Sequence, residues 1–440
     1  MTDPRRFPSD IILGAATSAY QIEGAVDADG RGPSVWDTFA ATPGKVADGD
    51  TGEPGADHYH RWADDVDLMA SLGLQSYRFS IAWPRIQPDG SGPVNPKGLD
   101  FYRRLVDGLR ERGIRPMPTL FHWDLPQALQ DQGGWENRDV AKRFADYARI
   151  MFDALDVRDW LTLNEPKTVV EAGYQHGVHA PGFRDDARAY VALHHLLLAH
   201  GLAVQALRSS GGDRRIGPAL NLTPVYPAGS GPKSQRAVRH ADGLENRLYL
   251  DPILKGHYPD DTLQWIAARS PMPTLIADGD LTIISERVDL LGVQYYTPRY
   301  VTDDGEREYR HPTTQAWWQE IHAEGMYDLL LRITRDYGDV PLVITENGMP
   351  APDEPDADGA VRDPWRVNFL RDHLDAVRRA VADGARVEGY HLWSLLDNFE
   401  WAEGYRQRWG IVYVDYATQR RTLKDSALWY RDFIKTRDLR

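Results

Sequence analysis

The sequence predicts a single α/β domain built as a closed (β/α)8 barrel, the TIM-barrel arrangement, with elaborated loops after its strands. Three observations lead to this fold class. Eight short apolar segments alternate along the 440 residues with longer segments of helical periodicity, and such alternation indicates a parallel sheet. Barrels of this type reach this chain length as one unit. No Pro/Gly-rich linker divides the chain, so we expect one domain over residues 1–440.

The eight apolar segments are rich in Leu, Val and Ile, as expected for strands that are covered on both faces. In chain order they are 11–17, 74–81, 115–121, 158–163, 215–221, 288–295, 341–346 and 387–393. Amphipathic helices are predicted between them, most clearly over 60–72, 98–112, 138–155 and 366–383. Segments 224–243 and 301–318 follow the fifth and sixth strands, and we expect both to be irregular. Because the loops after the strands form the mouth of a barrel, these two should shape its outer, leaving-group side.

Composition limits the classes of partner and chemistry. A formal net charge of −14 disfavours nucleic acid and anionic membranes, because both require clustered Lys and Arg. The chain has no cysteine, which excludes disulfides, thiolate nucleophiles and Cys-based metal sites. The first eight residues lack the apolar core of a signal peptide, and we identify no stretch of roughly 18 apolar residues that would span a membrane. We therefore expect a cytoplasmic protein.

Two carboxylates stand at the ends of predicted strands. Glu165 follows the apolar run 160–163 and Asn164, and Glu346 ends the run 342–346. The carboxyl ends of parallel strands carry the chemistry of barrel enzymes, so two such tips predict two carboxylates in one pocket. An acid at a strand end can also be a helix cap or half of an ion pair, but both segments carry more polar groups than a cap needs.

These two segments also carry a family resemblance. Thr-Leu-Asn-Glu-Pro (162–166) and Ile-Thr-Glu-Asn-Gly (344–348) resemble, in this order, the acid/base and nucleophile motifs of the retaining β-glycosidases of glycoside hydrolase family 1. The resemblance covers essentially the whole chain, with further matching motifs at 14–24, 77–85, 120–126, 393–401 and 410–416. It implies hydrolysis of terminal, non-reducing β-D-glucosyl residues with retention of configuration. Cello-oligosaccharides, β-galactosides and β-fucosides stay open as substrates.

Retaining hydrolysis of an acetal needs a nucleophile at the anomeric carbon and a proton donor at the leaving oxygen, from two carboxyl groups roughly 5–5.5 Å apart. By resemblance, Glu346 is the nucleophile and Glu165 is the acid/base. Arg78, which we expect at the tip of the second strand, and Tyr296 match the residues that support the nucleophile. Like charges this close should drive the two pKa values apart.

A sugar site requires polar side chains for vicinal hydroxyls and aromatic faces for C–H surfaces. The residues that match the family's sugar-binding set are Gln21, His122, Asn164, Trp393, Glu400, Trp401 and Trp409. Among them, Asn164 would bind the 2-hydroxyl and Trp393 would form the sugar platform. The 14 tryptophans agree with such a site, although aromatic burial alone would account for most of them. The expected partner is a small β-glycoside or oligosaccharide, and the oligomeric state stays open.

Other candidate signals are weaker. His58 and His60 could suggest a metal, but alternate residues leading into a helix point apart, and we give His194 and His195 the same interpretation. No phosphate loop or dinucleotide fingerprint follows a strand, and acid–base hydrolysis needs no cofactor. The glycosylation sequon at Asn221 lies on a predicted barrel strand, so we interpret it as coincidental.

Four features depart from the family pattern and bear on rate and specificity. Lys167 stands where many members have Trp, Gln294 where Asn is usual, and Trp409 where Phe is usual. The adjacent Trp317 and Trp318 cannot be matched uniquely to the family's Trp that stacks on the leaving group. We hypothesise that Trp409 crowds the 5-hydroxymethyl group of the sugar; the alternative is that it packs outward and fills core.

Three other functions stay open. One is glycosyl transfer to a non-water acceptor, and another is sugar binding without catalysis, because a fold does not guarantee a function. The third is hydrolysis of phosphorylated sugars. That activity would be expected to place Ser and Lys around 400–408, where Glu400 would instead repel a 6-phosphate.

Overall fold

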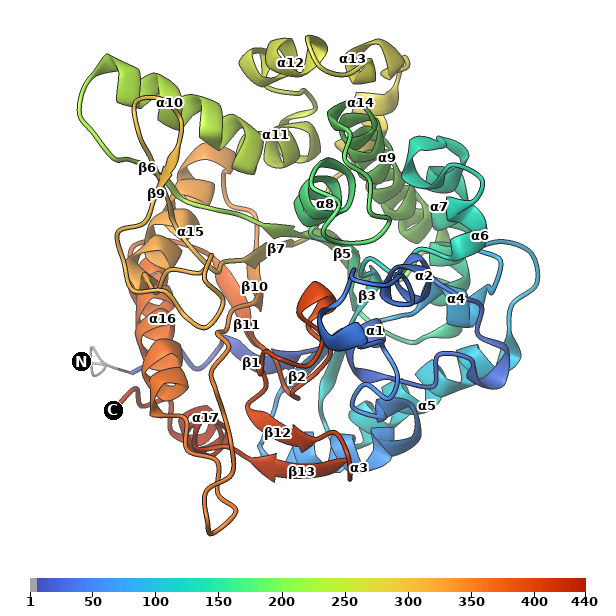
Figure 1. Ribbon diagram of the computed structural model, residues 1–440, viewed down its shortest axis with the longest axis vertical. Helices are drawn as coiled ribbons and strands as arrows, with labels where there is room; N and C mark the ends of the chain where they lie inside the picture. Colours follow the sequence, from blue (N-terminus) through green and yellow to red (C-terminus); the bar gives the residue numbers. More distant parts are fainter. Residues whose placement is uncertain (1–5) are drawn as a thin grey trace.

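The computed structural model describes residues 6–440. Its centre is a closed barrel of parallel strands in the order β1-β11-β10-β7-β5-β4-β3-β2, surrounded by helices (Figure 1). In chain order, the strands are β1 (Ile12–Ala16), β2 (Ser76–Ser80), β3 (Arg115–Phe121), β4 (Asp159–Asn164), β5 (Arg215–Asn221), β7 (Leu291–Gln294), β10 (Leu342–Glu346) and β11 (Val387–Trp393). All eight predicted strands are present, and the predicted fold class is confirmed.

The barrel strands are buried because helices cover their outer face and side chains from the strands themselves fill the interior. Every residue of β2 and β10 is buried, as expected for parallel strands without a solvent face. The register brings polar strand ends together: Glu346 of β10 pairs with Gln294 of β7, and Asn164 of β4 pairs with Ala219 of β5. These polar residues therefore meet at the carboxyl end of the barrel.

Long helices pack around the barrel. They are α3 (His58–Ser71), α5 (Pro96–Glu111), α7 (Asp139–Ala154), α9 (Asp186–Ser210), α15 (Ala323–Tyr337), α16 (Pro364–Ala382) and α17 (Asp425–Thr436). The four helices expected from the sequence correspond to α3, α5, α7 and α16, with bounds that differ by one or two residues. In α5, Pro96 fits the first turn, and the side chain of Asn95 accepts a hydrogen bond from the Lys97 amide.

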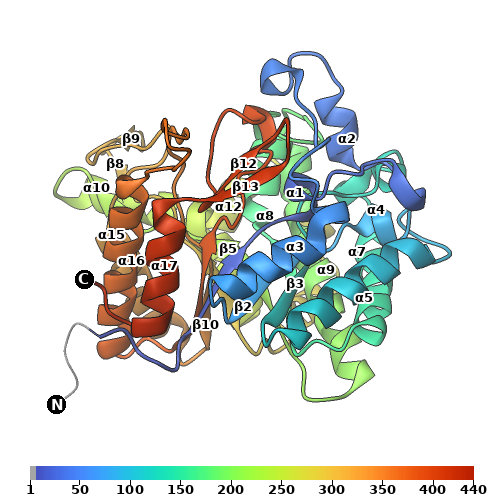
Figure 2. The same cartoon turned by 90° about the horizontal axis from the view of Figure 1, so that it is seen from below.

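Shorter elements occupy the connections. The short helices are α1 (Ala19–Ile22), α2 (Val35–Ala40), α4 (Trp83–Ile86), α6 (Gln127–Gln130), α8 (Pro166–Thr168), α11 (Leu248–Lys255), α12 (Asp260–Ala267), α13 (Met272–Leu275) and α14 (Asp280–Ile284). After β11, the hairpin β12 (Val412–Asp415) and β13 (Arg420–Leu423) leads into α17. The first described residues and the C-terminal end lie on the same side, near α16 and α17 (Figure 2), where the Phe7 amide donates to the Arg437 carbonyl over 2.9 Å.

The prediction that segments 224–243 and 301–318 are irregular was partly wrong. They contain or adjoin β6 (Val225–Pro227), α10 (Pro232–Asp242), β8 (Arg299–Val301) and β9 (Arg307–Glu308). The three strands form their own small sheet, in the order β6-β8-β9, next to α10 (Figure 1). Strands of two or three residues are too short to show a period of two, and β6 and β8 pair across a long stretch of chain.

Helix α9 corrects the statement that no stretch resembles a membrane span. By length and composition it could cross a membrane, with a mean hydropathy of 1.3 over its most apolar 18 residues. In the fold, however, 78% of that stretch is buried, and α9 packs against α7 and α14. A predominantly apolar helix that is buried on most of its sides is a core element.

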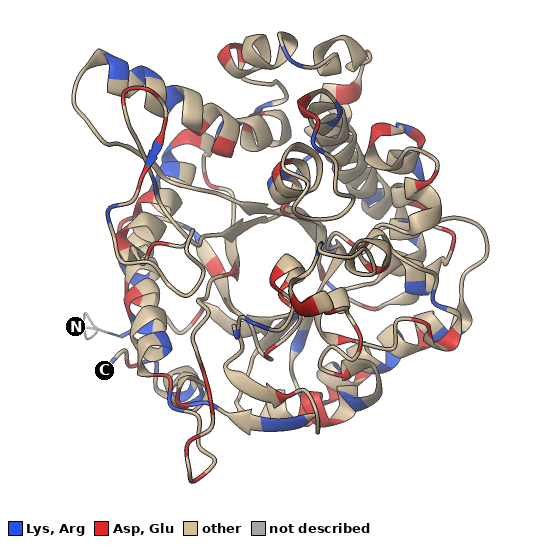
Figure 3. Cartoon of the chain, viewed as in Figure 1, with Lys and Arg blue, Asp and Glu red and all other residues tan. Residues whose placement is uncertain are grey.

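Charged residues of both signs are interspersed on the outer helices and loops (Figure 3). Arg379 of α16 and Glu324 of α15, for example, form an ion pair over 2.7 Å, with side chains that are 36% and 47% exposed. Exposed pairs of this kind contribute only about 0–1 kcal/mol. The outer surface therefore contributes less to stability than the apolar layers beneath it.

Candidate active site

Glu165 stands at the turn between β4 and α8. Its backbone has φ 46° and ψ 65°, a left-handed conformation that is uncommon for a residue with a side chain, and its amide donates to the Ala219 carbonyl of β5 over 2.9 Å. Pro166 then starts the helix. The turn places the Glu165 side chain at the carboxyl end of the barrel, where it is 95% buried.

Glu346 is the last residue of β10, and both of its carboxylate oxygens are hydrogen-bonded. Arg78 donates from Nη1 to Oε1 over 2.5 Å, and the Tyr296 hydroxyl donates to Oε2 over 2.7 Å. We had expected Arg78 at the tip of β2, but it lies in the middle of that strand. Its side chain therefore reaches along the barrel interior. Charge-assisted hydrogen bonds of this type favour the ionised carboxylate.

The surroundings of the two acids separate their protonation. Burial, followed by the negative charge of Glu346, raises the pKa of Glu165 to about 8. Burial also raises the pKa of Glu346, but Arg78 and the hydrogen bond from Tyr296 oppose that rise. Glu346 therefore ionises first, while Glu165 keeps its proton near neutral pH.

Arg78 also determines the direction of the hydrogen bonds around Asn164. Because a guanidinium only donates, Asn164 must present Oδ1 to Arg78 Nη2, which lies 2.5 Å away. Gln294 then donates from Nε2 to the same oxygen over 2.7 Å. Asn164 Nδ2 faces His122 Nε2 over 3.0 Å. Burial, followed by the charge of Arg78, lowers the pKa of His122 well below its usual value, so His122 is neutral and carries its hydrogen on Nδ1.

Gln21 and Glu400 meet at the other side of the site. Gln21, in α1, donates from Nε2 to Asn398 Oδ1 and the Phe399 carbonyl, each over 2.9 Å, and to Glu400 Oε2 over 3.3 Å. Burial, followed by the charges of Glu346 and Glu165, raises the pKa of Glu400 to about 8. Three carboxyl groups thus repel one another within one site.

Aromatic rings enclose these polar groups. His122 stacks on Trp393 and Trp401, with ring centroids 5.9 Å apart in both cases. Trp409 is buried and packs edge-on against Tyr296 at 5.8 Å. Hydrogen bonds, ring contacts and electrostatic interactions therefore connect the eleven predicted site residues at one end of the barrel.

Two of the departures from the family pattern change the mouth of the site. Lys167 is 95% buried, and its Nζ donates to Glu245 over 2.8 Å and to the Thr223 hydroxyl over 3.1 Å. Trp318 packs against Trp409, with centroids 6.3 Å apart, whereas Trp317 is 70% exposed. Trp318 thus belongs to the aromatic wall, and Trp317 extends beyond it.

The sequence analysis missed three residues that contact the site. Trp123, at φ 79°, donates from Nε1 to the Asn164 carbonyl over 2.9 Å and packs on Trp401. Asn398 binds Gln21, and the Thr168 hydroxyl donates to Glu165 Oε2 over 2.7 Å. Trp123 and Asn398 lie inside family motifs that the sequence analysis recognised, so their place in those motifs could have identified them. Thr168 lies in no such motif, and no sequence pattern indicated it.

The histidine pairs do not form metal sites. His58 binds Asp65 and is buried, whereas His60 is 61% exposed and binds Asp57. His194 and His195 likewise have separate partners. Over the described range 6–440, no group of three or more His, Asp or Glu side chains could hold a metal ion.

Three buried polar atoms in this site lack a hydrogen-bond partner among residues 6–440. They are His122 Nδ1, Gln294 Oε1 and Trp409 Nε1. Buried polar groups are normally satisfied. Two free donors and a free acceptor beside an acid pair suit a ligand that is rich in hydroxyl groups.

Comparisons with known proteins agree with this geometry. The chain is 50% identical to the thermostable β-glucosidase B of Thermobispora bispora, over 99% of this chain and 92% of that protein. It is 43% identical to a bifunctional β-D-glucosidase/β-D-fucosidase of Bifidobacterium breve, over 97% and 98% of the two chains. The structure of the Thermotoga maritima β-glucosidase in complex with glucoimidazole superposes with a TM-score of 0.95 at 44% identity, over 98% and 99% of the chains. The model of glycosyl hydrolase family 1 matches residues 3–439, and the chain belongs to that family.

Proposed function

We propose that this chain is a retaining β-glucosidase that hydrolyses terminal, non-reducing β-D-glucosyl residues through a covalent glycosyl-enzyme. One observation carries the proposal. Arg78 and Tyr296 stabilise the ionised form of Glu346, while Glu165, in the same site, has a pKa raised to about 8. A nucleophile and a protonated acid are thus present together at neutral pH.

In the first step, a carboxylate oxygen of Glu346 attacks the anomeric carbon as the bond to the leaving oxygen breaks. Glu165 gives its proton to that oxygen, so the leaving group departs as a neutral alcohol. Arg78 holds the nucleophile in place and, with Tyr296, limits the basicity of the attacking carboxylate. The product of this step is a glycosyl ester on Glu346.

In the second step, the same acid becomes a base. Once Glu346 is esterified, its negative charge no longer raises the pKa of Glu165, so Glu165 ionises more easily. It then takes a proton from a water molecule that attacks the anomeric carbon from the side the leaving group vacated. Two inversions at one carbon give net retention.

The free polar atoms supply sugar recognition. Asn164 Nδ2 has a second hydrogen for the 2-hydroxyl, a contact that strengthens in the transition state, and His122 Nδ1 donates to a neighbouring hydroxyl. Gln21 and Glu400 address the hydroxyls farther from the anomeric carbon. Trp393 and Trp401 provide the aromatic faces for the sugar ring.

The substrate range includes candidates beyond glucosides. Similarity to the bifunctional glucosidase/fucosidase supports β-fucosides, whereas Glu400 offers no cation to a 6-phosphate and so disfavours 6-phosphorylated sugars. Transfer to a sugar or alcohol acceptor differs only in which hydroxyl Glu165 deprotonates. A panel of aryl β-glucoside, galactoside, fucoside, xyloside and 6-phosphoglucoside, with product analysis for transfer, ranks these possibilities.

The nucleophile assignment has a direct test. A 2-deoxy-2-fluoro-β-glucoside with a good leaving group should inactivate the protein, because its second step is slowed. Intact-mass analysis should show one added fluoroglucosyl group, and peptide mapping should place it on Glu346. An adduct on Glu165 would reverse the roles of the two acids, and no adduct would overturn the assignment and return sugar binding without catalysis as the better account.

A further inference from the structure

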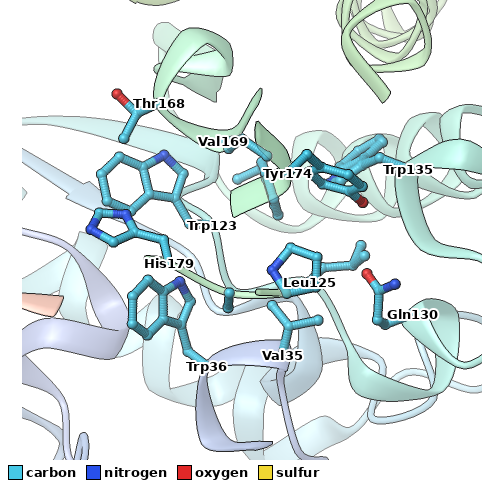
Figure 4. A pocket seen from close by; sticks show the side chains of 13 residues that line it. Val35, Trp36, Trp123, Leu125, Gln130, Trp135, Thr168, Val169, Tyr174 and His179 are labelled. Carbon is cyan, nitrogen blue, oxygen red and sulfur yellow. The ribbon is translucent and has the colours of Figure 1, made fainter. Parts of the chain in front are cut away.

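Thr168 is hydrogen-bonded to the acid that we assign to proton transfer. It lies one turn after Glu165, and its hydroxyl donates to Glu165 Oε2 over 2.7 Å. On its other side, Asn221 Nδ2 donates to Thr168 Oγ1 over 3.4 Å. Thr168 stands at the edge of a small aromatic-lined cavity next to Trp123, with its hydroxyl oxygen directed away from the rings (Figure 4). Its hydroxyl thus faces polar neighbours.

The direction of these bonds decides where the proton of Glu165 resides. A threonine hydroxyl has one hydrogen and two acceptor positions. Asn221 occupies one acceptor position, and Thr168 donates its hydrogen to Glu165 Oε2. When Glu165 is protonated, Oε2 accepts this hydrogen bond. The acidic proton is therefore on the other oxygen, Oε1.

We propose that Thr168, oriented by Asn221, is a positioning residue that directs the proton of Glu165 to Oε1 and holds the carboxyl in one orientation through both steps. The proposal rests on the proposed role of Glu165 as acid/base. In the first step the arrangement presents Oε1 to the leaving oxygen. In the second step, the same hydrogen bond stabilises the carboxylate that must accept a proton from water.

Thr168 acts within a larger set of charges. The hydrogen bond from Thr168 lowers the pKa of Glu165 and so opposes the effects of burial and Glu346. The titratable and charged groups that face Glu165 from the surrounding elements are Glu346 of β10, Arg78 of β2, Lys167 of α8, Tyr296 after β7 and Glu400 after β11. Substituting Thr168 changes none of these charges, which isolates its own contribution.

The proposal also gives the sequon at Asn221 a structural role. Asn221 ends β5 with its amide engaged by Thr168. The third residue of the sequon, Thr223, accepts a hydrogen bond from Lys167. Both side chains therefore contact α8, the helix that begins after Glu165.

The test compares two substitutions that each remove one half of the side chain. Thr168→Val keeps the branched shape and removes the hydroxyl, whereas Thr168→Ser keeps the hydroxyl and removes the methyl group. In Thr168→Val, we expect the basic limb of the kcat/KM profile on phenyl β-glucoside to move up by about one pH unit, the size of one hydrogen bond to a charged group. The kcat value should fall roughly ten-fold with little change in KM, because orientation rather than binding is lost. Thr168→Ser should keep the wild-type limb, and Asn221→Ala should give a smaller shift in the same direction.

A double substitution separates positioning from folding. In a Glu165→Ala background, Thr168→Val should leave turnover of dinitrophenyl β-glucoside unchanged. The proposal would be overturned by equal shifts of the basic limb in Thr168→Val and Thr168→Ser, or by a loss of turnover from Thr168→Val that persists without Glu165. A lowered Tm with an unmoved basic limb would overturn it too.

The same variants separate this proposal from the proposed role of Glu165. If the rate of Glu165→Ala does not depend on the leaving group, the role of Glu165 fails. If that dependence is present and the basic limb of Thr168→Val is unmoved, only the role of Thr168 fails.

Discussion

At the scale of single residues, one guanidinium sets the polarity of the site. Arg78 can only donate hydrogen bonds, so it places a positive charge beside Glu346 and orients Asn164 with Oδ1 toward the guanidinium. The orientation of Asn164 then decides which atoms of Gln294 and His122 face it. A lysine would offer one point charge in place of a planar fork and could not hold both acceptors in this geometry.

Replacing Glu165 with Ala should slow substrates with poor leaving groups by roughly 10²–10⁴, the usual contribution of general acid–base catalysis. Dinitrophenyl glucosides should lose much less in their first step, because their leaving group needs no proton. Added azide should restore turnover by attacking the glycosyl-enzyme without a base. Steady-state rates and product analysis check this: a β-glycosyl azide is expected, and an α-azide or equal losses on both substrates would contradict the role.

The pH dependence of kcat/KM should be bell-shaped. The acidic limb follows ionisation of the nucleophile and the basic limb follows loss of the proton on the acid, and with Glu165 near 8 the basic limb should fall around pH 8. These are macroscopic values of a coupled pair. The profile of Glu165→Ala on dinitrophenyl glucoside should lack the basic limb. A limb that persists there would mean that another group donates the proton.

We expect Trp409 to affect sugar specificity. It packs against Tyr296, which donates a hydrogen bond to Glu346, and against Trp318. This position favours crowding of the 5-hydroxymethyl group over outward packing. Trp409→Phe should therefore raise the preference for glucoside over xyloside and fucoside. A change of this size in a pocket is worth about 1–3 kcal/mol, so the ratio of kcat/KM values should rise by roughly ten-fold or more. An unchanged ratio with a lower Tm would show that Trp409 only fills space.

Sequence patterns predicted the candidate site residues, which the structure brings together, but not the hydrogen bonds and ion pairs between them. The two acids, Arg78 and the sugar-binding set stand in recognisable motifs at strand ends, and parallel strands gather those ends. Side-chain partners are different, because they depend on three-dimensional packing: Lys167 binds Glu245, 78 positions away. Thr168 has no motif of its own, so only its position relative to Glu165 identifies it.

At the scale of elements, predictability followed length and burial. The barrel strands are apolar over several residues, and α5 and α7 carry long periodic faces, so both kinds of element were found. The small sheet of β6, β8 and β9 was not, since its strands are short and half-exposed. Such elements are defined by the chain they pair with rather than by their own sequence.

The ion pair between Lys167 and Glu245 connects α8 to the segment before α11. Its side chains are 6% and 10% exposed, and Arg299 pairs with the same carboxylate. Glu245→Ala should lower the free energy of unfolding by about 3–5 kcal/mol, because it leaves a buried ammonium unpaired. Lys167→Met should cost less, since Glu245 keeps Arg299.

Urea unfolding measures both effects. Asp100→Ala is a matched control, because its partner Arg104 and its own side chain are 49% and 62% exposed, and such a pair is worth about 0–1 kcal/mol. Similar losses for Glu245→Ala and Asp100→Ala would show that the buried pair is well hydrated.

At the scale of the whole molecule, the active site works against stability. Glu165, Glu346 and Glu400 share one site with a single guanidinium, and the pKa values of Glu165 and Glu400 are raised to about 8. The fold must therefore keep Glu165 and Glu400 protonated at pH values where a glutamate in water is ionised. Strain of this kind is common where function requires it.

The stability cost of Glu165 should depend on pH in a defined direction. Below pH 4.5, the ordinary value for Glu, the carboxyl is protonated in both the folded and the unfolded chain, so it contributes no difference. Between pH 4.5 and about 8 the unfolded chain releases the proton and the folded chain keeps it, so each pH unit lowers the stability by up to ~1.4 kcal/mol.

Glu165→Gln should abolish this loss of stability. It should raise the free energy of unfolding by a few kcal/mol at pH 8 and change it little at pH 4.5, and Glu400→Gln should do the same to a smaller extent because Glu400 is partly exposed. Urea unfolding at both pH values, with the exposed Glu111→Gln as control, measures the difference; an equal gain at pH 4.5 and pH 8 would trace the effect to packing rather than to the raised pKa.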